Sequence, residues 1–202
     1  MVCSECGRWA DDRPVVGGAI ACECGARRPF ELLPLYVVTG ASAAGKSTVG
    51  QRLFGSREVP VILDADILWS PEMDTPEDGY ARFRATLMRL VANIHQSNTH
   101  TMLIGSGVPE QFYQRPERRY IGEIHWVALV CDDEEIERRL RARPPWRGVT
   151  DSFIASMQQF NAHLRARSDM RVIDTSTSSV DTTVHEVLSW LRDVGWQPPA
   201  EQ

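Results

Sequence analysis

Gly40-Ala41-Ser42-Ala43-Ala44-Gly45-Lys46-Ser47-Thr48 joins a short apolar run, residues 35–38, to a segment with helical spacing of its apolar side chains. The glycines and the small residues between them let the backbone curl, so that consecutive N–H groups face one point. A helix that begins directly after such a curl adds positive potential at the same point. The stretch therefore predicts a strand, an anion-binding loop and a helix, in that order.

The loop also fits the pattern G-x-x-x-x-G-K-[ST], in which the backbone holds the β-phosphate of a nucleotide. In this pattern Lys46 reaches the β- and γ-phosphates, and the Ser47 hydroxyl is a ligand of Mg²⁺. Of the 22 basic residues, Lys46 is the only lysine, and all others are arginine. A compact ammonium fits between phosphates where a planar guanidinium fits poorly. Residues 40–48 thus predict a site for ATP and Mg²⁺, with Lys46 as a catalytic residue; the alternative is a chance match in a glycine turn.

Apolar runs and amphipathic segments alternate along the rest of the chain. Strands are predicted at residues 35–39, 59–63, 101–104, 124–130 and 171–173. Helices are predicted at residues 46–54, 79–96, 132–141, 151–167 and 180–194. Strands that are apolar on both sides and separated by helices indicate an α/β fold, with a five-stranded parallel sheet covered by helices on both faces. A composition change near Glu31 predicts a head at 1–31, a main domain at 32–195 and a flexible tail at 196–202.

The amino-acid composition argues against several classes of protein. The chain has 202 residues, 43% of them hydrophobic, and a net charge of −5, which argues against a surface that binds nucleic acid throughout. No run approaches the roughly 18 apolar residues of a membrane span, and the N-terminus lacks a signal-peptide pattern. We therefore expect a cytoplasmic protein without a membrane partner. The sequence leaves the oligomeric state open.

Two aspartates, Asp64 and Asp66, follow the second predicted strand of the main domain. The carboxyl ends of parallel strands form the ligand-binding edge of a sheet. If the chain stays extended, both carboxylates point toward the γ-phosphate, where one can orient Mg²⁺ and the other can accept a proton from an attacking hydroxyl. The alternative is a helix cap with a solvated neighbour.

Residues 40–48 followed by Leu63-Asp64-Ala65-Asp66 resemble the small P-loop kinases, the group that includes shikimate, gluconate, adenylate and antibiotic kinases. The resemblance covers residues 32–194. It implies the strand order 2-3-1-4-5, a closing lid, and ATP with Mg²⁺ as the phosphoryl donor. It also implies that Asp64 lies on the Mg²⁺ side and that Asp66 binds the substrate hydroxyl as base. The residues alone leave open which aspartate is the base.

The same resemblance assigns roles to a helix rich in glutamate and arginine and to the loop after the last strand. It implies that Arg139 lies near the adenine and that Arg143, beside a short lid at residues 144–150, lies near the transferred phosphate. Arginines of this helix can equally pair with its glutamates on a solvated face. Asp174 and Thr175 resemble the loop that borders the adenine, and the alternative for them is a helix-capping turn.

The sequence signals for residues that bind the phosphoryl acceptor are weaker than those for the ATP site. Trp69, just after Asp66, is a candidate for lining a pocket, although aromatic residues more often pack in the core. Arg84 belongs to the helix on which such kinases hold their substrate, and it is a candidate for binding a substrate anion; a surface role is equally compatible with the sequence. Gly105, after the third strand, allows the backbone to approach a ligand, or it marks a turn.

The head contains two cysteine pairs, Cys3-x2-Cys6 and Cys22-x-Cys24, each followed by glycine. Four thiolates can form a tetrahedral Zn²⁺ site, and about thirty residues are too few to fold on an apolar core alone. The head therefore resembles a zinc ribbon and predicts structural Zn²⁺. Its second pair is one residue shorter than the usual C-x2-C, so a degenerate, metal-free knuckle is the alternative. The fifth cysteine, Cys131, is predicted to be buried.

The leading hypothesis is a transferase: an ATP-dependent kinase acting on a hydroxyl or phosphate of a small molecule, such as a nucleoside, nucleotide or antibiotic. One alternative is a polynucleotide 5′-kinase whose head holds nucleic acid, which we do not favour. Another is a nucleotide-gated NTPase or binding module that uses residues 127–133 as its Mg²⁺-binding strand. The lid-like helix and the proline that follow this strand argue against the NTPase alternative. The sequence does not encode the acceptor.

Overall fold

The computed structural model describes residues 2–10 and 12–199, which form two compact units. Of the described residues, the unit that we call the head unit comprises 2–35, 68–101 and 109–124. The unit that we call the sheet unit comprises 36–67, 102–108 and 125–199. Each unit is built from segments that are distant in sequence.

The sheet unit is organised on a five-stranded sheet with the order β5-β6-β4-β7-β8. Its strands are β4 (Leu35–Gly40), β5 (Val61–Asp64), β6 (Thr101–Ile104), β7 (Ile124–Val130) and β8 (Arg171–Asp174). Counted from β4 as the first strand, this order reads 2-3-1-4-5. At one edge β7 and β8 run parallel, with Val127 opposite Arg171 and Val130 opposite Asp174. All six residues of β4 are buried, as expected for a central strand.

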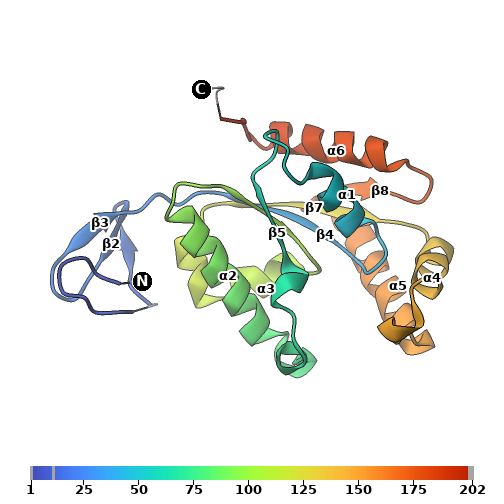
Figure 1. Cartoon of the computed structure of the whole chain (residues 1–202), viewed down its shortest axis with the longest axis horizontal. Coiled ribbons are helices and arrows are strands. Elements are labelled where there is room, and N and C mark those ends of the chain that lie inside the picture. The colour runs from blue at the N-terminus through green and yellow to red at the C-terminus, as the bar shows by residue number, and fades with distance from the viewer. Residues whose placement is uncertain (1, 11, 200–202) are drawn as a thin grey trace. The chain divides into compact units, whose positions relative to one another are not determined.

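Helices cover both faces of the sheet, and Figure 1 shows α6 above the strands and α5 below them. The helices of the sheet unit are α1 (Lys46–Leu53), α4 (Asp133–Arg141), α5 (Asp151–Arg165) and α6 (Val180–Asp193). Side chains alternate along β7: Val127 and Leu129 pack in the cluster with α1 and α6, whereas Ala128 and Val130 pack against α5. The predicted α/β fold with a parallel sheet and helices on both faces is therefore confirmed.

Two local features of the structure go beyond what the sequence pattern shows. The chain does not stay extended from Asp64 to Asp66, because β5 ends at Asp64 and a 3-10 helix, η1, occupies Ala65–Leu68. Trp196, expected in the flexible tail, is 9% exposed, and its indole Nε1–H donates to the carbonyl oxygen of Glu58 at 2.9 Å. Its large apolar ring packs with α6, so the ordered chain continues past α6. Residues 200–202 of the expected tail lie outside the described residues.

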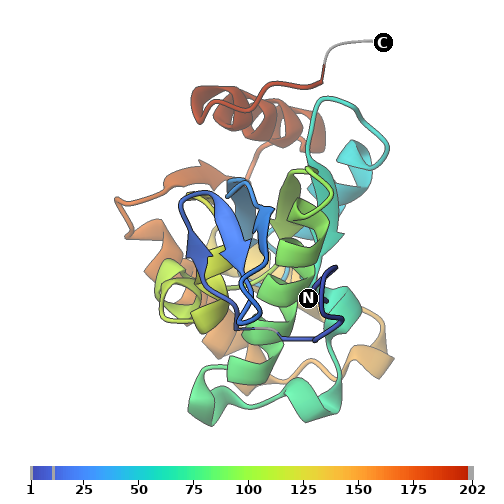
Figure 2. The same ribbon diagram turned by 90° about the vertical axis from the view of Figure 1, so that its left-hand side faces the viewer.

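The head unit combines a small antiparallel ribbon with helices from later in the chain. The ribbon has three strands, β1 (Val15–Val16), β2 (Ala19–Ala21) and β3 (Arg27–Pro29). The helical elements are η2 (Pro71–Met73), η3 (Pro76–Asp78), α2 (Ala81–His95), α3 (Pro109–Tyr113) and η4 (Pro116–Tyr120). Figure 2 shows the ribbon, in blue, beside α2, in green, and the two share an apolar cluster. The domain boundary expected between residues 31 and 32 stays a prediction.

The sequence pattern did not predict the short elements α3 and η1 to η4, which have three to five residues each. Periodicity needs a longer window than these elements offer. Among the described residues, no helix combines the length and hydropathy that a membrane span requires.

A buried histidine, His95, lies near the end of α2. It is 3% exposed, and neither ring nitrogen has a hydrogen-bond partner among the described residues. Burial, and secondarily the neighbouring His100, lowers the pKa of His95 to about 4. Glu31 acts on His100 by raising its pKa, against the effect of burial. The head unit therefore folds with His95 neutral.

This burial predicts acid sensitivity. The pKa of His95 is lower in the folded than in the unfolded chain, so its contribution to stability is complete above the unfolded value of about 6.5 and is lost as the pH falls toward 4. Between pH 7 and pH 5 the free energy of unfolding of the wild type should fall by about 2 kcal/mol more than that of His95→Leu. Denaturant unfolding at both pH values measures this difference. Equal losses in the two proteins would show that His95 is not the titrating group.

Candidate functional site

The loop between β4 and α1 has the backbone of an anion cradle. Gly45 has φ 98° and Ala43 has φ 74°, so two residues of the loop take the left-handed conformation that alternating N–H groups require. Gly40 is needed for another reason, because a Cβ there would lie 2.6 Å from the carbonyl oxygen of Leu129 on β7. The curl is therefore fixed by close backbone packing at its start and by positive φ angles further along.

Lys46 folds back over this loop. Its Nζ donates to the carbonyl oxygens of Gly40 at 2.8 Å and Ala41 at 2.9 Å. Burial lowers the pKa of Lys46 to about 8, against the opposing effect of the Asp66 charge. No carboxylate forms an ion pair with Lys46 in the described part of the chain. The Lys46 ammonium is thus bound by carbonyl groups of the loop and has no carboxylate as an ion-pair partner among the described residues.

The three other predicted catalytic residues all act electrostatically on Lys46. Asp66 and Asp64 favour its charged form, and Arg143 disfavours it. Asp64 is half-buried, and its Oδ1 accepts the backbone N–H of Asp66 at 3.0 Å, which begins the turn into η1. The Asp66 side chain is exposed. The structure therefore brings both carboxylates near the ammonium, although through a turn and not through an extended strand.

A loop after β6 supports the cradle from the sheet side. The Ser106 hydroxyl donates to the carbonyl oxygen of Gly40 at 2.9 Å, and the Thr39 hydroxyl donates to that of Gly107 at 2.6 Å. Gly105 lies so close to Ala65 that an added Cβ would come within 2.6 Å of the Ala65 Cβ. The shape of residue 105 thus lets the ends of β5 and β6 approach each other.

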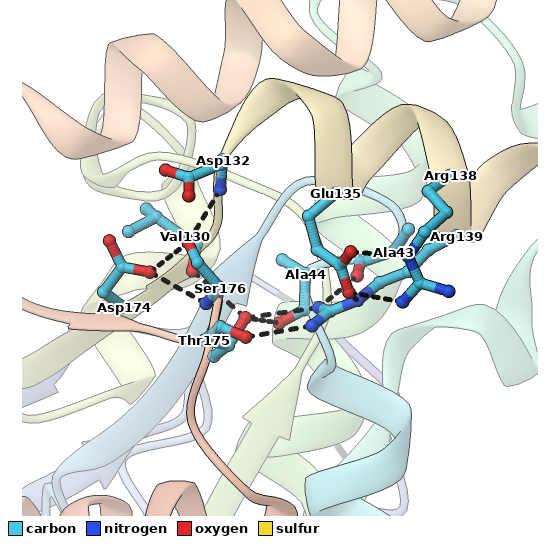
Figure 3. A network of polar contacts seen from close by, with 10 residues as sticks. All are labelled: Ala43, Ala44, Val130, Asp132, Glu135, Arg138, Arg139, Asp174, Thr175 and Ser176. Carbon is cyan, nitrogen blue, oxygen red and sulfur yellow. Dashed lines mark hydrogen bonds and ion pairs between the residues drawn. The ribbon is translucent and has the colours of Figure 1, made fainter.

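Arg139 on α4 links the cradle to the loop after β8, as Figure 3 shows. Its Nη1 donates to the carbonyl oxygen of Ala43 at 3.1 Å, and its Nη2 donates to that of Thr175 at 2.9 Å. The Thr175 side chain is buried, and its Oγ1 lies 3.1 Å from the carbonyl oxygens of both Ala44 and Val130. Arg139 and Thr175 thus hold the outer side of the cradle.

Glu135 fixes the orientation of Arg139. Its Oε1 accepts from Arg139 Nε at 2.6 Å, and it also binds the Arg138 guanidinium. These two arginines lower the pKa of Glu135 to about 2. The sequence offered pairing between the arginines and glutamates of this helix as an alternative, and Glu135 makes such pairs with Arg138 and Arg139.

Asp174 has local partners on the same loop. Its Oδ1 accepts from the backbone N–H of Ser176 at 2.8 Å and from the Ser176 hydroxyl at 2.5 Å, and its other oxygen lies 3.3 Å from Arg165. Figure 3 shows Asp174 and Ser176 on the Asp132 side of the network. The sequence alternative, a capping turn, describes these contacts.

The segment expected as a lid contains a short 3-10 helix, η5 (Pro145–Arg147). Trp146 is 76% exposed, and the Arg147 guanidinium lies 4.7 Å from the centre of its ring. Arg143 is half-buried; burial and the charge of Arg147 lower its pKa, against the effect of Asp66.

Two acceptor-side candidates come together in the head unit. The ring of Trp69 packs edge-on against Phe83 at 5.2 Å and lies 6.0 Å from Tyr80. Arg84 is 5% exposed, its guanidinium lies 5.4 to 6.0 Å from the ring centres of Tyr80, Phe83 and Phe112, and its Nε has no partner among the described residues. Burial lowers the pKa of Arg84 to about 10. Arg84 is therefore a desolvated cation inside an aromatic cluster.

Tyr80 is a residue of this cluster that the sequence interpretation missed. It precedes α2 with φ 60°, a left-handed conformation that is uncommon for a residue with a side chain. Gly79 before it has φ 65°. This backbone turns the Tyr80 ring toward Trp69 and Arg84. A Gly-Tyr step before a helix carries no motif, so no sequence signal marks Tyr80.

The four cysteines of the head converge. The Sγ atoms of Cys3, Cys6, Cys22 and Cys24 all lie within 4.8 Å of one another, and all four residues are free thiols. The closest Sγ pairs are Cys3–Cys24 and Cys6–Cys22, both at 3.8 Å.

Both knuckles end in a left-handed glycine. Gly7 N–H donates to the carbonyl oxygen of Cys3 at 3.0 Å, and Gly25 N–H donates to that of Cys22 at 2.9 Å. Gly7 has φ 68° and Gly25 has φ 88°. The shorter second pair thus closes with an i to i+3 bond where the first uses i to i+4. The tighter turn at Gly25 compensates for the residue that the second cysteine pair lacks. The four-cysteine cluster is compatible with a bound metal ion.

A family model described as an AAA domain matches residues 37–152, which include the cradle, both aspartates and Arg143. No curated protein matches the sequence significantly.

Solved structures with the same fold include several kinases. A sugar kinase from Janibacter sp. HTCC2649 is 20% identical with a TM-score of 0.61, over 80% of this chain and 95% of that one. A gluconokinase from Sinorhizobium meliloti 1021 is 19% identical with a TM-score of 0.60, over 80% and 93% of the two chains. The APS kinase of Mycobacterium tuberculosis is 18% identical with a TM-score of 0.55, over 81% and 99%. The predicted fold of small P-loop kinases is thereby confirmed.

The close approach at Gly40 predicts the effect of adding one methyl group. Gly40→Ala should lower the free energy of unfolding by about 1 to 3 kcal/mol, because β7 backbone must move away from the new Cβ. Ala43→Gly is the matched control: it removes a methyl group at a positive φ and should stay within about 1 kcal/mol of wild type. Denaturant unfolding measures both. An unperturbed Gly40→Ala would contradict the packing described for the cradle.

Proposed function

The chain belongs to the AAA domain family, and we propose that it is an ATP-dependent kinase that transfers the γ-phosphoryl group to a hydroxyl or phosphate of a small molecule. The observation that carries the proposal is the ammonium of Lys46, which lies in the loop without an ion-paired carboxylate and under the influence of Asp66 and Asp64. A cation held in this way favours an anionic ligand beside it.

In this proposal the loop from Gly40 to Thr48 binds the phosphoryl donor, ATP. Its backbone N–H groups, together with the start of α1, bind the phosphates of ATP, and Lys46 contacts the β- and γ-phosphates. Ser47 and Asp64 are the residues that would hold Mg²⁺. When bound, Mg²⁺ neutralises charge on the phosphate oxygens. Arg139 and Thr175 place the loop that borders the adenine, and Asp174 shapes that loop through Ser176.

Asp66 is the proposed base for the acceptor hydroxyl. Its side chain is exposed, and its charge acts on Lys46, so it is accessible to a substrate near the γ-phosphate. Asp64 is half-buried and accepts a backbone hydrogen bond, which suits an orienting role. Arg143, whose charge is also felt at Lys46, offers a guanidinium to the transferred phosphoryl group.

Arg84 and Trp69 are the proposed acceptor-binding residues of the head unit. A buried guanidinium without a carboxylate partner gains most from an anionic group, such as a carboxylate or phosphate of the acceptor. Trp69, 45% exposed at the edge of the same cluster, can stack on the acceptor. Gly105 is also proposed to contribute to the acceptor site, because it has no side chain and its backbone can lie close to Ala65.

Structural Zn²⁺ is the proposed metal of the cysteine cluster. A tetrahedral site with Zn–S bonds of about 2.3 Å requires S···S separations of about 3.8 Å. The closest Sγ pairs lie at that separation. Four thiolates also leave no open coordination position, so the ion would serve the fold of the head and not the chemistry.

Paired substitutions test the donor site. Lys46→Ala should weaken binding of a fluorescent ATP analogue by at least about a hundredfold, because the loop loses its only ammonium. Asp66→Asn should bind the analogue within about threefold of wild type yet lower kcat for transfer by a factor of about a hundred to ten thousand. Near-normal turnover in Lys46→Ala would refute the donor site. An unchanged kcat in Asp66→Asn would move the base elsewhere, with Asp64 the next candidate.

Metal content tests the cysteine site. Protein purified without added zinc should contain one Zn²⁺ per chain by elemental analysis, and Cys24→Ser should lose most of it because only three thiolates remain. The matched control is Cys131→Ser, which removes a buried thiol outside the cluster and should keep the metal. A zinc content near zero in the wild type would refute the site.

A further inference from the structure

The cysteine head packs directly on α2. Ile20 and Phe30 from the ribbon form an apolar cluster with Ala92 of α2 and Tyr120 of η4. The rings of Phe30 and Tyr120 meet edge-on, with their centres 6.0 Å apart. All four of these residues are 5% exposed or less. The head therefore contributes to the core of the unit that contains α2.

Polar contacts join three separate parts of the head to the same helices. The Arg28 guanidinium donates to Gln96 Oε1 at 2.7 Å, directly after α2. The Arg89 guanidinium lies 5.9 Å from the centre of the Trp9 ring. Arg119 Nη1 on η4 donates to the carbonyl oxygen of Asp12 at 2.7 Å. Because the contacts are spread over the head, α2 is held only if the whole head keeps its shape.

A chain of hydrogen bonds connects the first cysteine knuckle to η4. Cys3 N–H donates to the carbonyl oxygen of Arg8 at 3.0 Å, and the Arg13 guanidinium donates to the same oxygen. Arg13 is 7% exposed. Its own carbonyl oxygen accepts from the Tyr120 hydroxyl at 2.8 Å. The position of Cys3 is thus connected to Tyr120 through the carbonyl group of Arg8 and the buried Arg13.

The head cannot keep this shape through its own secondary structure. Its strands have two, three and three residues, and β3 is exposed along its whole length. About thirty residues cannot bury enough apolar surface to offset their conformational entropy, so such modules depend on a metal or on disulfides. Since the cysteines are free thiols and their Sγ spacing fits Zn²⁺, a metal ion bound by them would fix the head.

The opposite end of α2 holds the desolvated Arg84. The helix places Arg84 and Ala92 eight residues, or about 12 Å, apart along one axis. Burial of a guanidinium without a carboxylate partner costs free energy, so the N-terminal end of α2 is stable only if other contacts hold the helix. The contacts with the head are of this kind.

We propose that the metal-loaded head is a brace that keeps α2 ordered, so that Zn²⁺ occupancy at the cysteines controls the position of Arg84 at the far end of the helix. Arg13, Arg28 and Tyr120 are the positioning residues that transmit this effect. The consequence for catalysis, that loss of zinc raises the KM for an anionic acceptor and leaves ATP affinity unchanged, rests on the proposed function; the brace itself does not.

Hydrogen exchange of the full chain, read by mass spectrometry, tests the brace without reference to activity. The probe is zinc alone, present or removed by a chelator that is selective for Zn²⁺ over Mg²⁺. Removal should accelerate exchange in α2 and η4 by at least about tenfold, whereas α6 of the sheet unit should not change. Faster exchange confined to residues 2–31 would overturn the proposal, because the head would then be an independent module. Equal acceleration in α6 would also overturn it, because the metal would then hold the whole fold.

Two arginine variants separate the brace from the metal site. Arg13→Ala keeps all four cysteines but removes the bond to Arg8, and it should retain one zinc per chain while α2 exchanges faster than in wild type. Arg27→Ala is the control, because its exposed guanidinium donates to Val16 within the head, and it should match wild type in both measurements. Slow, wild-type exchange of α2 in zinc-loaded Arg13→Ala would show that Arg13 transmits nothing.

Discussion

The nucleotide loop depends on one arrangement: its carbonyl groups are held from outside. Lys46 and Ser106 donate to Gly40, Arg139 donates to Ala43, and the Thr175 hydroxyl lies within hydrogen-bond distance of Ala44. These donors fix the carbonyl groups of the loop from outside, and within the loop the Ala44 N–H donates to the carbonyl oxygen of Ala41. The donors come from α1, from α4 and from the loops after β6 and β8, so the order of the parallel sheet is what brings them together.

Each of the two compact units contains a cation that is at least half-buried. Lys46 in the sheet unit and Arg84 in the head unit both have a pKa lowered by burial, and neither forms an ion pair among the described residues. A buried charge without a partner is expensive, and it is kept where a ligand supplies the counter-charge. Lys46 suits the phosphates of ATP, and Arg84 suits an anionic group on the acceptor. Both features favour a kinase for a small anionic molecule over a protein that only switches on nucleotide binding.

The sequence predicted the sheet, its helices and the loop correctly because each rests on a strong local pattern: long apolar runs, helical spacing and a glycine-rich motif. It could not predict that Asp64 begins a turn, since a 3-10 helix of four residues leaves no periodicity. It also could not predict the role of Tyr80, because that role lies in a tertiary contact with Arg84. The sequence also could not show how the short cysteine pair closes, because this depends on the turn at Gly25.

The central claim is that the phosphoryl group reaches a small molecule. Incubation of the zinc-loaded chain with Mg²⁺ and γ-labelled ATP, together with a panel of sugars, sugar acids, nucleosides, nucleotides and aminoglycosides, tests it directly. Separation of the products then distinguishes labelled organic phosphate from labelled inorganic phosphate. Our account predicts labelled organic phosphate with at least one acceptor, and more of it with anionic acceptors. Release of inorganic phosphate alone, accelerated only by a protein or a nucleic acid, would contradict it and favour a nucleotide-gated switch.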